Sequence, residues 1–211
     1  MRVPGELRAF KKAKTRDDLV RAALILFRRQ GFEKTTVEEI ALAAHSSPRT
    51  FFRYFGSKED LVFHDLPDHL AFMRERLVGA LERQNEWDAV VEAVIAVVTR
   101  FFSSSAGLAS ERFETWLREP TLLERFVVLC RDWETMIADA VAASRKTRAV
   151  DDPYARIVGM VASASVRCVI ESPRRGGFVD DVRALLEALG SGLRDAPEHS
   201  KPKRRSANTS R

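Results

Sequence analysis

Basic and aromatic side chains alternate over residues 47–55 (SPRTFFRYF), a combination suited to contacts with a DNA duplex. Arg49 can bind guanine through two hydrogen bonds, and Thr50 or Phe52 can contact thymine methyl groups. Hydroxyl and ammonium groups, such as that of Lys58, can hold a protein on the phosphates. The alternative is a purely structural helix pair with a solvated basic face. The predicted DNA-contacting residues are Thr36, Ser47, Pro48, Arg49, Thr50, Phe52, Arg53, Tyr54 and Lys58.

Metal binding and catalysis find little support elsewhere in the sequence. His64 and Asp68, and likewise Asp65 and His69, are spaced four residues apart, as helical metal ligands can be. Adjacent residues point to different helix faces, however, and Pro67 interrupts the spacing, so we expect solvated or helix-capping roles. No Ser-His-Asp set, glycine-rich phosphate loop, His-Glu-x-x-His motif or paired-carboxylate arrangement is readable. The sequence predicts no enzyme, no metal and no cofactor.

A helix-turn-helix over residues 35–61 would position the predicted DNA contacts. Thr36 and Glu39 form a capping-box pattern that begins the first helix. Ser47 followed by proline begins the second, because proline is tolerated at the first helical position. We expect Gly56 to end the second helix in the left-handed conformation.

A further helix is predicted to precede this motif, with Thr15 as its cap and Gly31 as its end. We expect Phe51 and Phe55 to point inward and hold the recognition helix in place. The buried stripe of the first helix is predicted to be Leu19, Ala22, Ala23, Leu26 and Phe27.

These motifs resemble the DNA-binding domain of TetR-family transcriptional regulators, over roughly residues 15–63. The shared pattern consists of I-A-x-A-A at residues 40–44, a serine before the recognition helix, T-F-F-x-Y-F at residues 50–55, and S-K-E-x-L at residues 57–61.

The resemblance implies that the positions of Thr50, Phe52, Tyr54 and Lys58 contact DNA. It also implies a larger C-terminal domain that binds a small effector and forms a two-fold dimer. One departure stands out: the family usually has glycine at the turn where this chain has His45. Histidine is among the few residues other than glycine that are enriched at positive φ, so we expect the turn to be preserved.

The composition of the 211-residue chain is that of a globular protein, with 45% hydrophobic and 31% charged residues. Only 8 Pro and 10 Gly are present, and no run of alternating strand residues is visible. We therefore predict an all-α fold: an N-terminal three-helix DNA-binding domain and a larger C-terminal helical bundle, about nine helices in total.

Hydrophobic periodicity predicts where the later helices lie. Small residues in the middle of the helix over residues 153–171 would let another helix approach closely. The predicted helices cover residues 57 to about 83 with a bend or break at Pro67, then 87–103, 110–118, 120–144, 153–171 and 178–193.

Positive charge is concentrated at the two ends of the chain. Residues 1–65 hold 13 Lys/Arg against 9 Asp/Glu, residues 66–195 hold 17 against 20, and residues 196–211 hold 5 against 1. This distribution suits a nucleic-acid-binding module joined to a regulatory module. We assign residues 1–56 to DNA binding, with 1–14 as a flexible basic arm that is either solvated or in contact with DNA. Residues 57–195 are assigned to ligand binding and dimerisation, and 196–211 to a disordered basic tail.

Large aromatic and sulfur-containing side chains of the C-terminal region are either plain core or the lining of an apolar ligand pocket. The candidate pocket residues are Phe101, Phe102, Phe113, Trp116, Phe126, Trp133, Met136 and Met160. The last two predicted helices either pack within the chain or form the dimer interface that the resemblance implies. The candidate interface residues are Met160, Ala164, Arg167, Cys168, Val182, Leu185, Leu186 and Leu189.

The resemblance implies a ligand-responsive transcriptional regulator, most simply a repressor that binds a palindromic DNA operator as a homodimer and is released by a small hydrophobic effector. The alternatives are an activator or ligand-independent regulator of the same fold, and a helical protein-binding module with no DNA role. We expect a cytoplasmic protein without a membrane partner. Cys130 and Cys168 form no C-x-x-C motif, and no signal pattern or membrane-length apolar run is visible.

Overall fold

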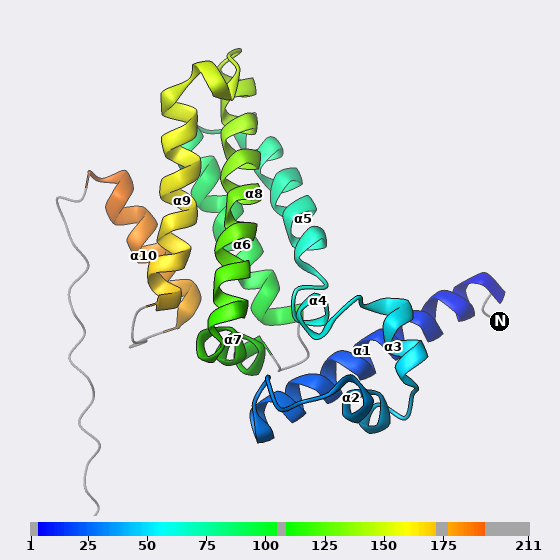
Figure 1. The fold of residues 1–211 in the computed structure, drawn as a ribbon. Helices are drawn as coiled ribbons and strands as arrows, with labels where there is room; N and C mark the ends of the chain where they lie inside the picture. The colour runs from blue at the N-terminus through cyan, green and yellow to red at the C-terminus, as the bar shows by residue number, and fades with distance from the viewer. Residues whose placement is uncertain (1–3, 105–108, 172–176, 193–211) are drawn as a thin grey trace, which may run out of the picture. The chain divides into compact units, whose positions relative to one another are not determined.

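The computed structural model of the chain describes residues 4–104, 109–171 and 177–192, and these residues contain helices and no strand (Figure 1). The all-α prediction is confirmed. The predicted basic tail over residues 196–211 lies outside the described residues. The helices are α1 (Pro4–Gln30), α2 (Val37–Ala43), α3 (Pro48–Tyr54), α4 (Lys58–Val62), α5 (Leu66–Leu81), α6 (Glu86–Ser104), α7 (Ala109–Arg118), α8 (Pro120–Ser144), the short 3₁₀ helix η1 (Ala149–Asp151), α9 (Pro153–Glu171) and α10 (Phe178–Gly190).

The helices form two compact units. The first comprises Met1–Glu75 and Val97–Asp132, and the second comprises Arg76–Ala96 and Trp133–Arg211. Helices α5, α6 and α8 each supply residues to both units. The division into functional domains at residue 56 stays a prediction, because compactness alone does not test it.

Helix α1 begins eleven residues before Thr15, its predicted cap, and ends where predicted. Thr15 is not a cap: it lies inside the helix, and its hydroxyl donates to the carbonyl of Lys11 at 2.9 Å. Residues 4–14 are therefore helical, which contradicts the predicted flexible arm for that part of the chain. Gly31 has a φ of 88° and its N–H donates to Phe27 O at 2.9 Å, so glycine ends the helix as predicted.

The core of the first unit joins α1 to the three short helices that follow it. The rings of Phe27 and Phe32 pack with their centroids 4.9 Å apart. The predicted stripe on α1 is buried except at Leu26, which is half-buried while Leu24 takes the buried position. The other buried residues of this core are Ile40, Ala41, Phe51, Phe55, Leu61 and Val62.

The single helix predicted over residues 57 to about 83 is interrupted before Pro67 rather than at it. Helix α4 ends at Val62, and α5 begins at Leu66. Pro67 is thus the second residue of α5, where its missing N–H costs no helical hydrogen bond. A three-residue linker, Phe63 to Asp65, separates the two helices.

In the second unit, α9 packs closely against α8. A Cβ built on Gly159 would lie 2.5 Å from the carbonyl oxygen of Glu134, so only glycine fits at this crossing. This confirms the close approach predicted from the small residues of α9.

Helix α9 is long and apolar enough to cross a membrane by length and composition, but half of it is buried in the fold, as in a core helix.

Asp152 caps the start of α9, and α10 lies beside α9 (Figure 1). The carboxylate accepts from the N–H of Ala155 at 3.1 Å, from the hydroxyl of Thr147 at 2.8 Å, and from Arg145 Nε at 2.9 Å. The backbone N–H of Ala155 is the main cause that lowers the pKa of Asp152 to about 2, and Thr147 and Arg145 lower it further. Helix α10 extends to Gly190, and Leu193 of its predicted range lies outside the described residues.

Candidate nucleic-acid interface

Helix α2 begins with the predicted capping box. The N–H of Glu39 donates to Thr36 Oγ1 at 3.2 Å, and the N–H of Thr36 donates to Glu39 Oε2 at 2.9 Å. Gln30 Nε2 also donates to Glu39 Oε2, at 3.0 Å, which ties α2 to the end of α1. Thr36 is exposed, but its hydroxyl oxygen is committed to this cap.

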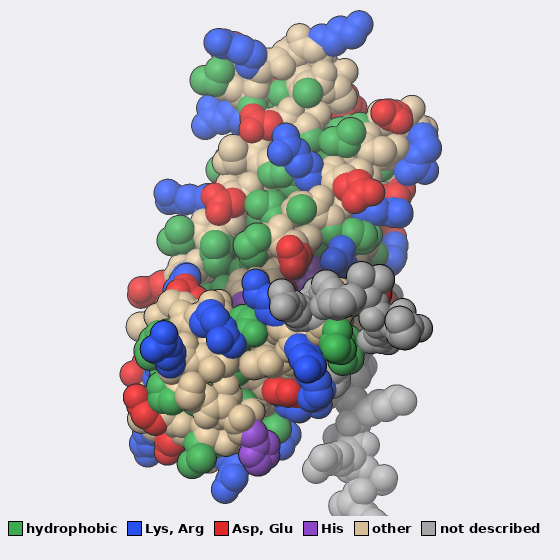
Figure 2. Space-filling model, turned by 90° about the vertical axis from the view of Figure 1, so that its right-hand side faces the viewer, with side chains coloured by type: hydrophobic (Ala, Val, Ile, Leu, Met, Phe, Trp, Pro, Cys, Tyr) green, Lys and Arg blue, Asp and Glu red, His purple; other side chains and the backbone are tan. Residues whose placement is uncertain are grey.

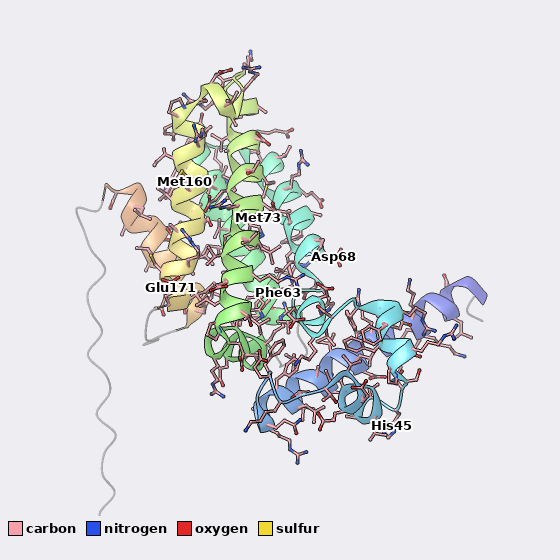
Figure 3. All side chains as sticks on the ribbon, in the orientation of Figure 1. His45, Phe63, Asp68, Met73, Met160 and Glu171 are labelled. Carbon is pink, nitrogen blue, oxygen red and sulfur yellow. The ribbon has the colours of Figure 1, made fainter. Side chains whose placement is uncertain are left out.

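The turn between α2 and α3 is a Schellman motif with histidine at its left-handed position. His45 has a φ of 49°, and its N–H donates to Leu42 O at 3.0 Å. The next N–H, of Ser46, donates to Ala41 O at 2.8 Å. The prediction that His45 takes positive φ is confirmed, and its labelled side chain marks this turn in Figure 3.

Helix α3 is held by its cap and by two buried rings. Ser47 caps it by accepting from the N–H of Thr50 at 3.2 Å, and Pro48 occupies the first turn. Phe51 and Phe55 are buried, and their ring centroids lie 5.4 Å apart. Both were predicted to point inward, and this is confirmed. Two turns of helix are thus oriented by core contacts on one side only.

The opposite side of α3 presents residues predicted to contact DNA. Arg49 and Arg53 are exposed, and Phe52 is 56% exposed, so the three share one face at helical spacing. Thr50 and Tyr54 are half-buried, and the guanidinium of Arg53 lies 5.1 Å from the centroid of the Tyr54 ring. Ser47 and Pro48 are exposed at the N-terminal end of the helix.

Lys58 has partners inside the chain. Its Nζ donates to the carbonyl of Phe32 at 2.9 Å and lies 3.5 Å from the carbonyl of Glu33. The same ammonium lies 4.5 Å from the centroid of the Phe32 ring. This lysine fastens α4 to the loop after α1, a role that the sequence motif did not reveal.

Gly56 does not end α3 in the predicted left-handed conformation, because positive φ at glycine occurs among the described residues only at Gly31 and Gly192. Phe55 caps the helix with an extended backbone at φ −136°. A Cβ at position 56 would lie 2.7 Å from Asp60 Oδ2, the end of a side chain that can move aside.

Basic side chains do not form one continuous field on the face seen in Figure 2. Lys and Arg lie among acidic and uncharged residues over most of that face. Charge alone therefore does not mark this face as a DNA-binding surface, and DNA contact by the exposed side of α3 stays a prediction. Leu42 of α2 is 78% exposed and was not predicted as a surface residue. The one sequence signal for its exposure is that it does not belong to the buried face formed by Ile40 and Ala41.

A second group of polar residues lies at the α4–α5 linker, and we call it the ion-pair cluster: Asp65, His69 and Arg112. Arg112 of α7 donates to Asp65 through Nη1 at 3.0 Å and Nη2 at 2.9 Å. His69 Nε2 lies 3.3 Å from Asp65 Oδ2. Arg112 is 1% exposed and His69 2% exposed. The Asp65–His69 pair, considered for a metal, is instead joined to a buried guanidinium.

Aromatic rings surround the ion-pair cluster. The guanidinium of Arg112 lies 4.3 Å from the centroid of Phe101 and 5.6 Å from that of Trp116. Trp116 lies 5.2 Å from the ring of Phe63 and is stacked on Phe126 at 5.1 Å. The cluster is thus a buried charged group with aromatic walls.

The local electrostatics follow from this burial. Burial by itself would raise the pKa of Asp65, but the hydrogen bond from His69 and the charge and hydrogen bonds of Arg112 outweigh it, so the pKa lies well below its usual range. Burial is also the main cause that lowers the pKa of the neighbouring His64, and Asp65 opposes that effect. His64 Nδ1 lies 2.8 Å from Leu61 O. Asp65 therefore carries a negative charge at neutral pH.

The candidate pocket residues divide between the two units. Phe101, Phe102, Trp116 and Phe126 come together in the first unit. Trp133, Met136 and Met160 belong to the second unit, where Met160 is 51% exposed over a groove between α8 and α9. The side chain of Phe113 lies outside the described residues.

Sequence reasoning missed Arg112 and Phe63, and the one available signal was the position of Arg112 on the stripe of Thr115 and Trp116.

The candidate interface residues also differ in exposure. Met160 and Cys168 are exposed on α9, and Ala164 and Arg167 are half-buried there. Leu185 and Leu189 of α10 are half-buried, whereas Val182 and Leu186 are fully buried within the second unit. Figure 3 shows Met160 in the middle of α9 and Glu171 at its end. The predicted interface stays a prediction.

Comparison with known proteins decides the family. The profile of the bacterial regulatory proteins of the tetR family matches residues 19–64, and the profile of the MftR C-terminal domain matches residues 84–195. The transcriptional regulator TcmR of Streptomyces glaucescens is 34% identical over 94% of this chain and 88% of its own length. The chain belongs to the TetR family. It is a DNA-binding transcriptional regulator and not an enzyme.

Other relatives and solved structures agree with this assignment. The regulator is 29% identical to the transcriptional regulator MftR of Mycobacterium tuberculosis, over 81% of this chain and 83% of that protein. Thermus thermophilus FadR with lauroyl-CoA aligns at a TM-score of 0.54 and 24% identity, covering 88% of this chain and 100% of that one. SmeT with triclosan aligns at a TM-score of 0.59 and 19% identity, covering 89% and 99%. These two likenesses show the fold.

Proposed function

We propose that the regulator represses transcription by binding a palindromic operator as a homodimer and is released by a small, largely apolar effector. The observation that carries the DNA part is the exposed face of α3. Arg49, Phe52 and Arg53 project from a helix whose other side is fixed by Phe51 and Phe55. A helix held in this way can enter a major groove without rearranging its own core.

The length of α3 supports a dimer. It has seven residues, so it is about 10 Å long and can read only a few base pairs. Two copies placed about 34–36 Å apart would read successive major grooves on one side of the duplex. A two-fold protein would therefore match an operator with palindromic half-sites.

Helix α9 offers a face for that dimer. Tyr154, Ile157 and Met160 are exposed apolar residues at helical spacing, and Cys168 continues the exposed side toward the end of the helix. A contiguous apolar stripe of this kind suits burial against a second copy. Val182 and Leu186 of α10 would support the face from inside the unit rather than contact the partner.

A dimer through α9 has a direct test in sedimentation. Ile157→Glu should convert a dimer to a monomer, because it places a carboxylate in the apolar stripe. Thr99→Glu, at an exposed position of α6, is the matched control and should stay dimeric. A dimer that survives Ile157→Glu would exclude this face.

The effector is proposed from the relatives and from the aromatic walls. The FadR structure contains lauroyl-CoA and the SmeT structure contains triclosan, so two proteins of this fold hold ligands with an apolar chain or ring. In this chain the rings of Phe63, Phe101, Trp116 and Phe126 pack together next to the α4–α5 linker. We propose this region as the effector site, in a protein that acts in the cytoplasm.

DNA recognition can be tested on the full-length protein with duplexes selected from a random-sequence library. Wild type should enrich a palindrome and bind it with a steep salt dependence. Arg49→Met should relax the preference at one position of each half-site, by about 1–3 kcal/mol. Arg131→Met, an exposed arginine on α8, is the control and should change neither affinity nor preference. Enrichment of no sequence, or an unchanged preference in Arg49→Met, would exclude the proposed docking.

Repression and activation use the same fold and need a separate test. Deletion of the gene should raise expression from the promoter that carries the operator. A fall in expression would identify an activator, and no effect of any ligand on operator binding would identify a ligand-independent regulator.

A further inference from the structure

Two buried polar atoms of the ion-pair cluster have no hydrogen-bond partner among the described residues: Nε of Arg112 and Nδ1 of His69. Both residues are almost fully buried. A buried donor or acceptor that lacks a partner costs about 1–3 kcal/mol. A molecule that supplies the missing partners would recover this free energy on binding.

The side chains that carry these two atoms meet at Asp65 through other atoms. Arg112 Nη1 and His69 Nε2 both contact the same oxygen, Asp65 Oδ2, at 3.0 and 3.3 Å. Both side chains also face one ring, with Phe101 at 4.3 Å from the guanidinium and at 5.7 Å from the imidazole. A polar substituent of a ligand beside the Phe101 ring would border both side chains.

From this geometry we infer that the effector is an aromatic or similarly flat apolar molecule carrying an oxygen substituent, a hydroxyl or a carboxyl group, and that Arg112 and His69 bind this oxygen. The inference rests on the proposed ligand-responsive function and names the ligand class of that site. The oxygen accepts a hydrogen bond from Arg112 Nε–H, and the apolar skeleton lies against the surrounding rings.

The state of His69 selects between the two oxygen groups. Asp65 is ionised and only accepts, so His69 Nε2 carries the proton of that contact. In the neutral ring Nδ1 is then an acceptor, and a ligand hydroxyl fits because it can donate to Nδ1 while accepting from Arg112. In the charged ring Nδ1 is a donor, and a carboxylate fits instead.

The position of the ion-pair cluster links this oxygen to DNA binding. Asp65 lies in the three-residue linker between α4 and α5, and α4 is fastened to the DNA-binding helices by Lys58. A ligand oxygen on Nε binds the same guanidinium that holds Asp65 through Nη1 and Nη2, and so acts on the segment that leads to α3. Ligands that bind Arg112 should therefore also reduce operator affinity.

The test is equilibrium dialysis of the full-length protein, without DNA, against three probes of one skeleton: 2-naphthol, 2-naphthoate and 2-methylnaphthalene. Wild type should bind at least one of the oxygen-bearing probes about ten-fold more tightly than the hydrocarbon, the expected worth of one hydrogen bond to a charged group. Naphthol above naphthoate indicates the hydroxyl arm, and the reverse order indicates the carboxyl arm.

Three variants decide whether the named residues carry the preference. Arg112→Lys keeps a charge for Asp65 but lacks Nε, and it should reduce the preference to less than about three-fold. His69→Phe keeps a ring beside Phe101 and should likewise reduce the preference for 2-naphthol over the hydrocarbon to less than about three-fold. If Arg112→Lys fails to fold, His69→Phe alone tests whether the cluster binds the oxygen. Arg118→Lys, at an exposed arginine of the same helix α7, should leave all three affinities unchanged.

Three results would overturn the inference: equal affinity for the three probes, an unchanged preference in both cluster variants, or no binding of any probe at about millimolar concentration. Failure of operator recognition would be seen separately, in the DNA selection, because the dialysis contains no DNA.

Discussion

Replacing Lys58 by methionine separates two roles for one residue. The family resemblance implies a DNA contact at this position, and an ammonium group suits a phosphate. The structure instead places the ammonium on the carbonyls of Phe32 and Glu33 at 2.9 and 3.5 Å. Methionine keeps most of the apolar stem and removes only the charge and its donors. The change therefore measures the ammonium contacts with little loss of packing.

The expected magnitude follows from the surroundings of the ammonium. A hydrogen bond from a charged donor is worth about 1.5–3 kcal/mol when buried, and a cation over an aromatic ring adds about 0.5–1 kcal/mol at an exposed site. Lys58 is half-buried, so both values are reduced by solvent. We expect Lys58→Met to lower the free energy of unfolding by about 1–2 kcal/mol, and the melting temperature by about 2–8 °C.

The assay combines denaturant unfolding with operator binding at several salt concentrations. If Lys58 neutralised one DNA phosphate in each protomer, its removal would reduce the slope of log K against log salt by about 0.9 per protomer. If Lys58 instead holds α4 within the chain, Lys58→Met should lower the free energy of unfolding and leave the slope of log K against log salt unchanged. Arg49→Met, which removes an exposed charge on α3, is the matched control and should leave stability unchanged. Unchanged stability together with a reduced slope for Lys58→Met would refute the internal role.

Three further changes test other parts of the fold. His45→Val should lower the free energy of unfolding by about 1–3 kcal/mol while His45→Gly stays near wild type, because a β-branched residue is strained at φ 49°; urea unfolding of both variants checks this, and equal effects would contradict it. Gly159→Ala should cost about 1–3 kcal/mol, since its Cβ would meet Glu134 O at 2.5 Å, and a wild-type melting temperature would contradict the close crossing. Asp152 has a pKa lowered to about 2, chiefly by the backbone N–H at the start of α9, so its stabilisation is complete above its ordinary pKa and is lost as the pH falls toward 2. As the pH falls over this range, the melting temperature of wild type should therefore decrease more steeply than that of Asp152→Asn. Parallel curves of melting temperature against pH would exclude the Asp152 cap as the cause of the acid destabilisation.

Much of the DNA-binding segment could be predicted because its determinants are local. The capping box of Thr36 and Glu39, the cap at Ser47, and the inward Phe51 and Phe55 involve residues only three or four positions apart. His45 was expected at positive φ from its own conformational preference, and the Schellman hydrogen bonds agree. The start of α1 was wrong for the same reason: Thr15 has the side chain of a cap, but the preceding residues also form helix.

By itself, the sequence determined the helical class, the caps that begin α2 and α3, and the exposed face of α3, since helix periodicity and capping act within one turn. Only the tertiary structure decided which distant groups meet. Arg112 and Asp65 are 47 residues apart, and Lys58 reaches a carbonyl 26 residues away. A buried charge is stable only beside its partner, and no local pattern names that partner. The most specific chemistry proposed for the effector site, on Arg112 and His69, therefore became visible only in the folded chain.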